Sequence, residues 1–205
     1  MRKFIRSIYK KIGMIFCLLH GVFEAVKVKI FPVKEKSILF VAHPDDDVLF
    51  FNRIMKTEKP YVVLLTTGSL MIRLKEFKKA MKYYGLRFNY YPLDTQDERE
   101  DKLASIIKSE LKKGNFEKCF SHSVNGEYGH VMHKRVGRAV LENAECRLFT
   151  TVSADETDKK ENELTEDEKK EKINIFRTIY SSQNFVLDEY EMWVYHEKTA
   201  EVRND

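Results

Sequence analysis

No stretch of the 205-residue sequence is apolar for long enough to cross a lipid bilayer as a helix. The least polar window, residues 12–26, has 15 residues and already includes His20 and Glu24, whereas a spanning helix needs about 20 apolar residues. A basic start precedes this window, but no small-x-small cleavage site of a signal peptide follows it cleanly. The sequence therefore excludes a transmembrane class of protein.

The sequence also lacks the cysteine pattern of a disulfide framework or a zinc finger. Its three cysteines are an odd number without metal-ligand spacing, and they lie in or beside apolar runs: Cys17, Cys119 and Cys146. Buried, reduced thiols are the interpretation that fits this usage. We therefore expect a cytoplasmic protein.

Positive charge is not in excess beyond residue 36. Residues 1–36 hold nine Lys or Arg and two acidic residues, a net charge of +7. Residues 37–205 hold 27 basic and 30 acidic residues, a net charge of −3. Nucleic-acid-binding domains carry a basic excess, so we expect no nucleic-acid partner.

The N-terminal segment, residues 1–36, predicts an amphipathic helix. Apolar residues recur there at spacings of three and four, as one face of a helix requires: Ile5, Ile8, Ile12, Ile15, Leu19, Val22 and Val26. Basic residues lie beside this stripe, so residues 1–30 fit peripheral contact with an anionic membrane surface at its cytoplasmic face. The alternatives are packing on the protein's own domain or on a second copy.

Residues 37–205 read as one α/β domain. Short apolar runs predict strands at residues 37–42, 61–67, 87–93, 118–122 and 147–152. Helical patterns lie near residues 47–57, 71–84, 98–113 and 131–143, and a capping box at Thr165 and Glu168 opens another helix. Alternating strands and helices predict a Rossmann-like three-layer domain with a mostly parallel sheet. The first half of residues 154–172 reads as a solvated loop.

Three polar loops follow predicted strands and should meet at one edge of the sheet, where ligands bind in such folds. They are AHPDDD (42–47), TTGS (66–69) and SHSVNGEYGH (121–130). The first carries His43 and Asp46, and the third leads to His130 and His133. Two imidazoles and a carboxylate form a common catalytic zinc set. Acids after a strand can also simply cap the next helix, but the histidine pair that follows the third loop favours a metal.

The same loops resemble a known family. AHPDDD resembles the AHPDDE signature of the PIG-L/LmbE-like de-N-acetylases, zinc hydrolases that remove acetyl groups from N-acetylglucosamine-containing glycans and glycolipids. SHSVNGEYGHVMH resembles the family's T-H-N-x-x-G-E-Y-G-H-x-x-H. Further matches are TTGS, the R-x-x-E-x-x-x-A pattern at residues 73–80 followed by Gly85, and Lys172 with YSSQ at residues 180–183. The resemblance covers about residues 37–197.

The resemblance implies a role for each matching residue. His43, Asp46 and His133 would bind Zn²⁺, or another divalent ion such as Fe²⁺ or Co²⁺. Asp45 would be the general base on the attacking water, and a protonated His130 would stabilise the oxyanion. For the substrate, the resemblance implies contacts from Arg73 and Asp94. His122, Glu127 and Asp47 are expected to support the ligands from behind. The alternatives are a satisfied histidine at a strand end for His122, a helix cap for Asp47, and a helix salt bridge with Glu76 for Arg73.

These expectations lead to a zinc-dependent N-deacetylase acting on an N-acetylglucosamine-type sugar, with the N-terminal segment pointing to a lipid-linked form. Asp47 stands where the family has glutamate, and LFFNR (49–53) follows where many members have glycines, so the substrate remains open. One alternative is a zinc amidase acting on a thiol-sugar conjugate or another acylated amine. Another is a relative that binds a sugar or a partner without catalysis.

Overall fold

A computed structural model describes residues 33–67, 71–93 and 100–202. The helix predicted for residues 1–30 and the predicted contact residue Asp94 lie outside these ranges, and both stay predictions. Within the described ranges, none of the helices combines the length and the apolar character that crossing a membrane demands.

The described strands form one sheet in the order β3-β2-β1-β4-β5-β6. The first five are parallel and β6 pairs antiparallel with β5, so the predicted mostly parallel α/β fold is confirmed. The five predicted strands are also confirmed, whereas the sequence reading missed β6. The strands are β1 (Ser37–Val41), β2 (Tyr61–Thr66), β3 (Phe88–Leu93), β4 (Lys118–Ser121), β5 (Arg147–Thr151) and β6 (Thr199–Val202).

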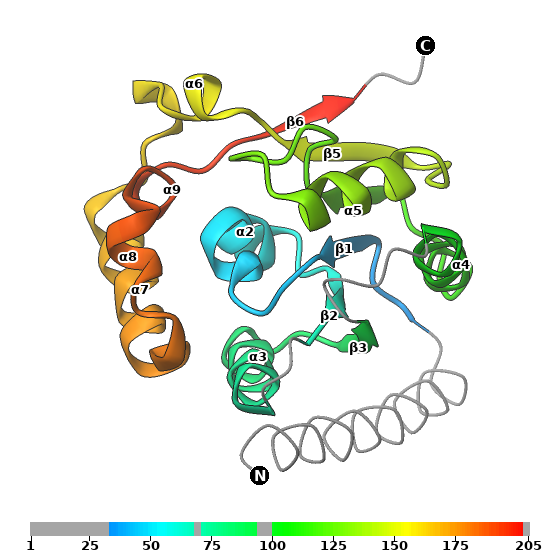
Figure 1. Cartoon of the computed structure of the whole chain (residues 1–205), viewed down its shortest axis with the longest axis horizontal. Coiled ribbons are helices and arrows are strands. Elements are labelled where there is room, and N and C mark those ends of the chain that lie inside the picture. The colour runs from blue at the N-terminus through cyan, green and yellow to red at the C-terminus, as the bar shows by residue number, and fades with distance from the viewer. Residues whose placement is uncertain (1–32, 68–70, 94–99, 203–205) are drawn as a thin grey trace, which may run out of the picture.

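Helices cover both faces of the sheet (Figure 1). Side chains of β1 alternate between the two faces, with Leu39 and Val41 packed in one buried cluster and Ile38 and Phe40 in the other. The first cluster includes residues of α2 (Asp46–Thr57), α3 (Met71–Tyr84) and α7 (Glu166–Thr178). The second includes residues of α4 (Glu100–Leu111) and α5 (Val131–Leu141).

In the C-terminal part of the chain, α7, α8 (Val186–Glu189) and α9 (Glu191–Tyr195) lie beside α2, on its side away from β1 (Figure 1). The capping box at Thr165 and Glu168 opens α7 as predicted. The preceding segment is not the loop that was predicted, because it forms two short helical turns before α7. These turns and the later elements are α6 (Ala154–Thr157), η1 (Lys160–Asn162), η2 (Ser181–Gln183), α8 and α9.

Charged groups attach this C-terminal part to α2. The helix is kinked at Phe51, and the backbone N–H of Arg53 just after the kink donates to a carboxylate oxygen of Glu197 at 2.7 Å. The Arg53 guanidinium donates to both oxygens of Glu168, at 2.8 and 2.9 Å. The fully buried Lys172 donates to the Trp193 carbonyl at 2.8 Å. These bonds fix the position of the C-terminal helices.

The Arg53–Glu168 pair predicts a specific acid sensitivity. Hydrogen bonding from Arg53 lowers the pKa of Glu168 from 4.5 to about 2. A lowered carboxylate pKa stabilises the fold above pH 4.5, and this stabilisation is lost as the pH falls from 4.5 towards 2. Glu168→Gln keeps the capping residue type but removes the charge. We expect this variant to lose less stability than the wild type between pH 5 and pH 3, measured by urea denaturation.

Glu166→Gln is the matched control for this prediction, because Glu166 lies in the same first turn of α7 and contacts Lys169 instead of Arg53. We expect it to follow the wild type at both pH values. If Glu168→Gln shows the wild-type acid sensitivity, the pair does not supply this pH dependence.

Candidate metal centre

The candidate site lies at the carboxyl ends of β1 and β4. These strands are neighbours in the sheet. The strands β2 and β3 lie on the other side of β1, and β5 and β6 lie on the other side of β4. The loops after them therefore leave in opposite directions and open a crevice, which is where open α/β sheets bind ligands. Both Thr66 at the end of β2 and His122 after β4 bond to the backbone of Ala42. The described parts of the three loops predicted to converge therefore meet here.

Three ligand atoms form a nearly equilateral triangle in this crevice. His43 Nδ1 is 3.2 Å from Asp46 Oδ2 and 3.3 Å from His133 Nε2, and the last two atoms are 3.3 Å apart. In a tetrahedral zinc site with bonds near 2.0–2.1 Å, neighbouring ligand atoms are about 3.3–3.4 Å apart. The three residues predicted as ligands therefore match the spacing of one face of such a tetrahedron.

Glu127 fixes the orientation of the His133 ring. Its Oε2 lies 2.5 Å from His133 Nδ1, and its Oε1 accepts from Thr151 and lies 2.8 Å from His122 Nδ1. Burial opposes ionisation, but the imidazoles of His122 and His133 outweigh it and lower the pKa of Glu127. An ionised Glu127 accepts the proton on His133 Nδ1 and so turns Nε2 towards the other two atoms of the triangle. Against the effect of burial, Asp46 and Glu127 also raise the pKa of His133 to about 10, so a metal ion would have to displace the proton on Nε2.

His122 supports the site from behind. It is fully buried, its Nδ1 faces Glu127, and its Nε2 accepts the backbone N–H of Ala42 at 3.1 Å. Two other groups could also hold an ion by proximity: Asp46, His122 and His133, or His43, His130 and His133. Because the Nε2 lone pair of His122 is used by Ala42, His122 is better placed to orient Glu127 than to bind a metal.

A glycine permits the close packing of α5 against this loop. A Cβ on Gly137 would lie 2.6 Å from the His122 carbonyl oxygen, which is closer than nonbonded atoms allow. With no side chain there, α5 approaches closely enough for the rings of His122 and His133 to stack with centroids 4.0 Å apart. Gly137 therefore helps to place His133.

Asp45 faces away from its neighbour Asp46. Its Oδ1 accepts a hydrogen bond from Arg73 at 2.9 Å, whereas Asp46 belongs to the ligand triangle. Burial raises the pKa of Asp45 well above its ordinary value, against the opposing effect of Arg73. Burial also acts on Asp46, but there His133 and His43 dominate and the pKa is lowered. The two adjacent acids thus have different environments and different proton affinities.

His130 caps the start of α5 beside the triangle. Its Nδ1 accepts the backbone N–H of Met132 at 3.2 Å, so in the neutral ring the proton lies on Nε2. Burial, together with the nearby His133 and His43, lowers the pKa of His130 to about 4. The cationic His130 expected from the sequence is therefore not the form that this site favours. The neutral ring still has one N–H to donate.

A cavity of about 280 Å³ opens onto these groups. Its lining combines polar site residues with an apolar wall from the C-terminal part: His43, Asp45, Asp46, Leu49, Arg73, Tyr128, His130, Gln183, Phe185, Val186 and Tyr190. The sequence reading gave no role to Tyr128 or Gln183, although both lie inside motifs that it quoted. Nothing in the sequence indicated Phe185 or Tyr190.

Arg73 is held at this cavity with spare hydrogen-bonding capacity. Its Nη2 donates to the Pro44 carbonyl at 2.7 Å and to Asp45 at 2.9 Å. Its Nε is buried without a hydrogen-bond partner in the described part of the chain. The helix salt bridge with Glu76 weighed from the sequence is not formed, because Glu76 instead accepts the backbone N–H of Ser182 at 2.8 Å.

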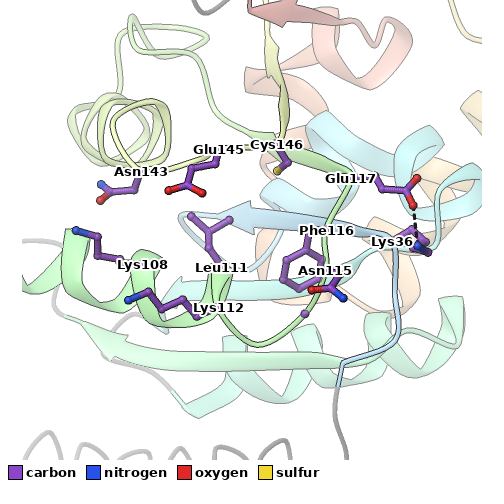
Figure 2. A pocket seen from close by; sticks show the side chains of 11 residues that line it. Lys36, Lys108, Leu111, Lys112, Asn115, Phe116, Glu117, Asn143, Glu145 and Cys146 are labelled. Carbon is purple, nitrogen blue, oxygen red and sulfur yellow. Dashed lines mark hydrogen bonds and ion pairs between the residues drawn. The ribbon is translucent and has the colours of Figure 1, made fainter.

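A larger cavity, of about 490 Å³, lies at the opposite edge of the sheet (Figure 2). Lys36, Glu117 and Cys146, which precede β1, β4 and β5, help to line it, and Lys36 pairs with Glu117 at 2.7 Å. It contains none of the predicted site residues. Since parallel sheets bind ligands at the carboxyl ends of their strands, the smaller cavity is the candidate site.

Comparisons with known proteins give distant similarities. No protein-family model matches the chain. The sequence is 21% identical over 194 residues to "Uncharacterized protein L374" of Acanthamoeba polyphaga mimivirus, with 84% of this chain and 82% of that protein covered. Among solved structures it is similar to GalB, the 4-carboxy-2-hydroxymuconate hydratase from Pseudomonas putida KT2440. That similarity has 12% identity and a TM-score of 0.47, and it covers 77% of this chain and 81% of the other.

Proposed function

We propose that the protein is a metal-dependent hydrolase that removes the acetyl group from an N-acetylated amino sugar. The observation that carries the proposal is the triangle of His43, Asp46 and His133 with the separately held carboxylate of Asp45 beside it. A ligand set with a neighbouring acid–base group is what metal-assisted hydrolysis requires. The resemblance of both motifs to the PIG-L/LmbE-like de-N-acetylases points to the same reaction.

Zinc suits the two imidazoles and one carboxylate, and Fe²⁺ or Co²⁺ would accept the same donors. When bound, the metal supplies a Lewis acid that polarises the amide carbonyl and eases deprotonation of water. Asp45 then takes the proton of the attacking water and delivers it to the departing amine. Its raised pKa makes it a better proton acceptor than an ordinary aspartate, and the protonated group can then act as the acid.

His130 donates to the carbonyl oxygen as negative charge develops there. The proton on Nε2 of the neutral ring serves for this purpose, because Nδ1 is already occupied by the backbone of Met132. A hydrogen bond that strengthens only in the transition state contributes about 3–4 kcal/mol in comparable sites. The chain thus supplies one group for the proton and another for the oxyanion.

The cavity fits a sugar better than an extended polymer segment. Its volume, about 280 Å³, lies just below the usual range for small-molecule sites, about 300–1,000 Å³. Arg73 has a donor free for a hydroxyl group, and Tyr128 and Tyr190 add aromatic rings to the lining, as sugar sites commonly use. Phe185 is 47% exposed at the margin, which suits an apolar group attached to the sugar. A lipid-linked substrate is part of this proposal.

Acetate release tests the proposal directly. We expect acetate from N-acetylglucosamine-type glycans or lipid-linked N-acetyl sugars when Zn²⁺ is supplied to the full-length protein, and no acetate after chelation until zinc is restored. Release of a different acid from another acylated amine would instead support the amidase alternative. Failure of all substrates with stoichiometric zinc bound would support a binding protein without catalysis.

A further inference from the structure

Asp45 has an unusual backbone conformation. Its φ is 102°, in a region that non-glycine residues rarely adopt. The energetic cost of such a residue is about 1–3 kcal/mol, and it persists only where surrounding contacts enforce it. Part of that enforcement is local, since Val48 and Leu49 at the start of α2 donate to the Asp45 carbonyl at 3.0 and 2.9 Å. The N–H of Asp45 is held by a different group.

Asp47 and Tyr180 together hold that N–H. Asp47 Oδ1 accepts the Asp45 N–H at 3.0 Å. The hydroxyl of Tyr180, 133 residues further along the chain, lies 2.8 and 2.9 Å from the two oxygens of Asp47. Both side chains are fully buried, so water cannot replace either bond. The orientation of Asp47, and through it the backbone of Asp45, therefore depends on the Tyr180 hydroxyl.

The position of Tyr180 is itself fixed. Its ring packs on Phe176 with centroids 6.0 Å apart. Just after it, the backbone N–H of Ser182 donates to Glu76 in α3 at 2.8 Å. The hydroxyl is therefore held in place, because the ring packs on the end of α7 and the following turn is anchored to α3.

We propose that Tyr180 is a positioning residue for the reaction, acting through Asp47 to keep Asp45 in its left-handed conformation. That conformation directs the Asp45 carboxylate to Arg73 and keeps it apart from the metal ligands. Without the hydroxyl, Asp47 loses its orientation and Asp45 relaxes towards an ordinary backbone conformation. This inference rests on the proposed function for its effect on catalysis, but its effect on the backbone is independent of any activity.

The backbone effect is measured by comparing Asp45→Gly with Asp45→Ala. Both remove the carboxylate, but only glycine adopts a φ of 102° without strain. We expect Asp45→Gly to have the higher urea midpoint in the otherwise wild-type protein. With Tyr180→Phe added, the difference should vanish or reverse, as it should with Asp47→Ala, which removes the acceptor instead of the donor. An unchanged difference in both backgrounds would overturn the inference.

The catalytic effect is measured on Tyr180→Phe alone. We expect kcat for acetate release to fall by about 10- to 100-fold, as for other small misplacements of a reacting group, with KM and the Kd for Zn²⁺ unchanged. Tyr84→Phe is the matched control, because the buried Tyr84 hydroxyl donates to Asn52 and not to the Asp45 loop. It should keep the wild-type kcat.

The two measurements separate the possible failures. If the wild-type protein releases no acetate, the proposed function fails, and the glycine–alanine comparison still decides the role of Tyr180. If the wild type is active and Tyr180→Phe keeps the wild-type kcat, the positioning role is wrong. A parallel loss of kcat in Tyr84→Phe would also refute it, since that result would indicate general destabilisation.

Discussion

Asp45→Asn will lower kcat for acetate release by about 10³-fold or more while zinc stays bound. The amide has the same size and tolerates positive φ, so the loop around the ligands should keep its shape. It cannot accept the proton of water, and general acid–base groups contribute about 10²- to 10⁴-fold to a rate. Zinc content by elemental analysis, measured beside kcat, separates loss of the base from loss of the metal.

Asp101→Asn is the control for this prediction, since Asp101 is exposed on α4 and takes no part in the site. It should match the wild type in both kcat and zinc content. An Asp45→Asn protein with more than a tenth of the wild-type kcat would show that another group accepts the proton.

His133→Ala will abolish stoichiometric zinc binding. The change removes one vertex of the triangle and leaves the buried carboxylate of Glu127 without its 2.5 Å contact. Loss of an outer partner alone weakens metal binding by about 10- to 100-fold, so Glu127→Gln should lie between this variant and the wild type. Competition with a zinc-binding dye gives the affinities, and circular dichroism checks that each variant folds.

His196→Ala provides the matched control, because His196 is only partly buried and bonds to the Met192 carbonyl away from the cavity. It should bind zinc like the wild type. If His133→Ala still holds one equivalent of zinc tightly, the ion uses a different ligand set and the triangle is not its site.

The periodicity of the sequence was sufficient to predict the elements that pack on both sides of the sheet. Continuous apolar runs such as YVVLLT in β2 are fully buried. A parallel strand covered on both faces is apolar at successive positions and does not alternate with polar residues, so such a run identifies it. The edge strand β6 was missed because TAEV is short and only partly buried. The polar segment before α7 also carries no apolar periodicity, so its short helical turns gave no signal.

The candidate site was predictable where local spacing and topology agree. His43 and Asp46 share one loop, His133 lies on the first turn of a helix, and neighbouring parallel strands bring these two loops together. The bond between Asp47 and Tyr180 joins positions 133 residues apart, and no local pattern relates them. Asp47 was expected to support the metal ligands, whereas its side chain bonds to the Asp45 backbone and to Tyr180, and the link to Tyr180 required the structure.

The order of the chain has a consequence for its synthesis. The three ligand positions all precede residue 134, whereas Gln183, Phe185 and Tyr190 on the cavity wall, and the tyrosine beneath Asp45, lie beyond residue 179. Proteins emerge from the ribosome N-terminus first. A nascent chain therefore contains the three proposed metal ligands before it contains the wall and the tyrosine, so the proposed metal centre precedes the cavity in the order of synthesis.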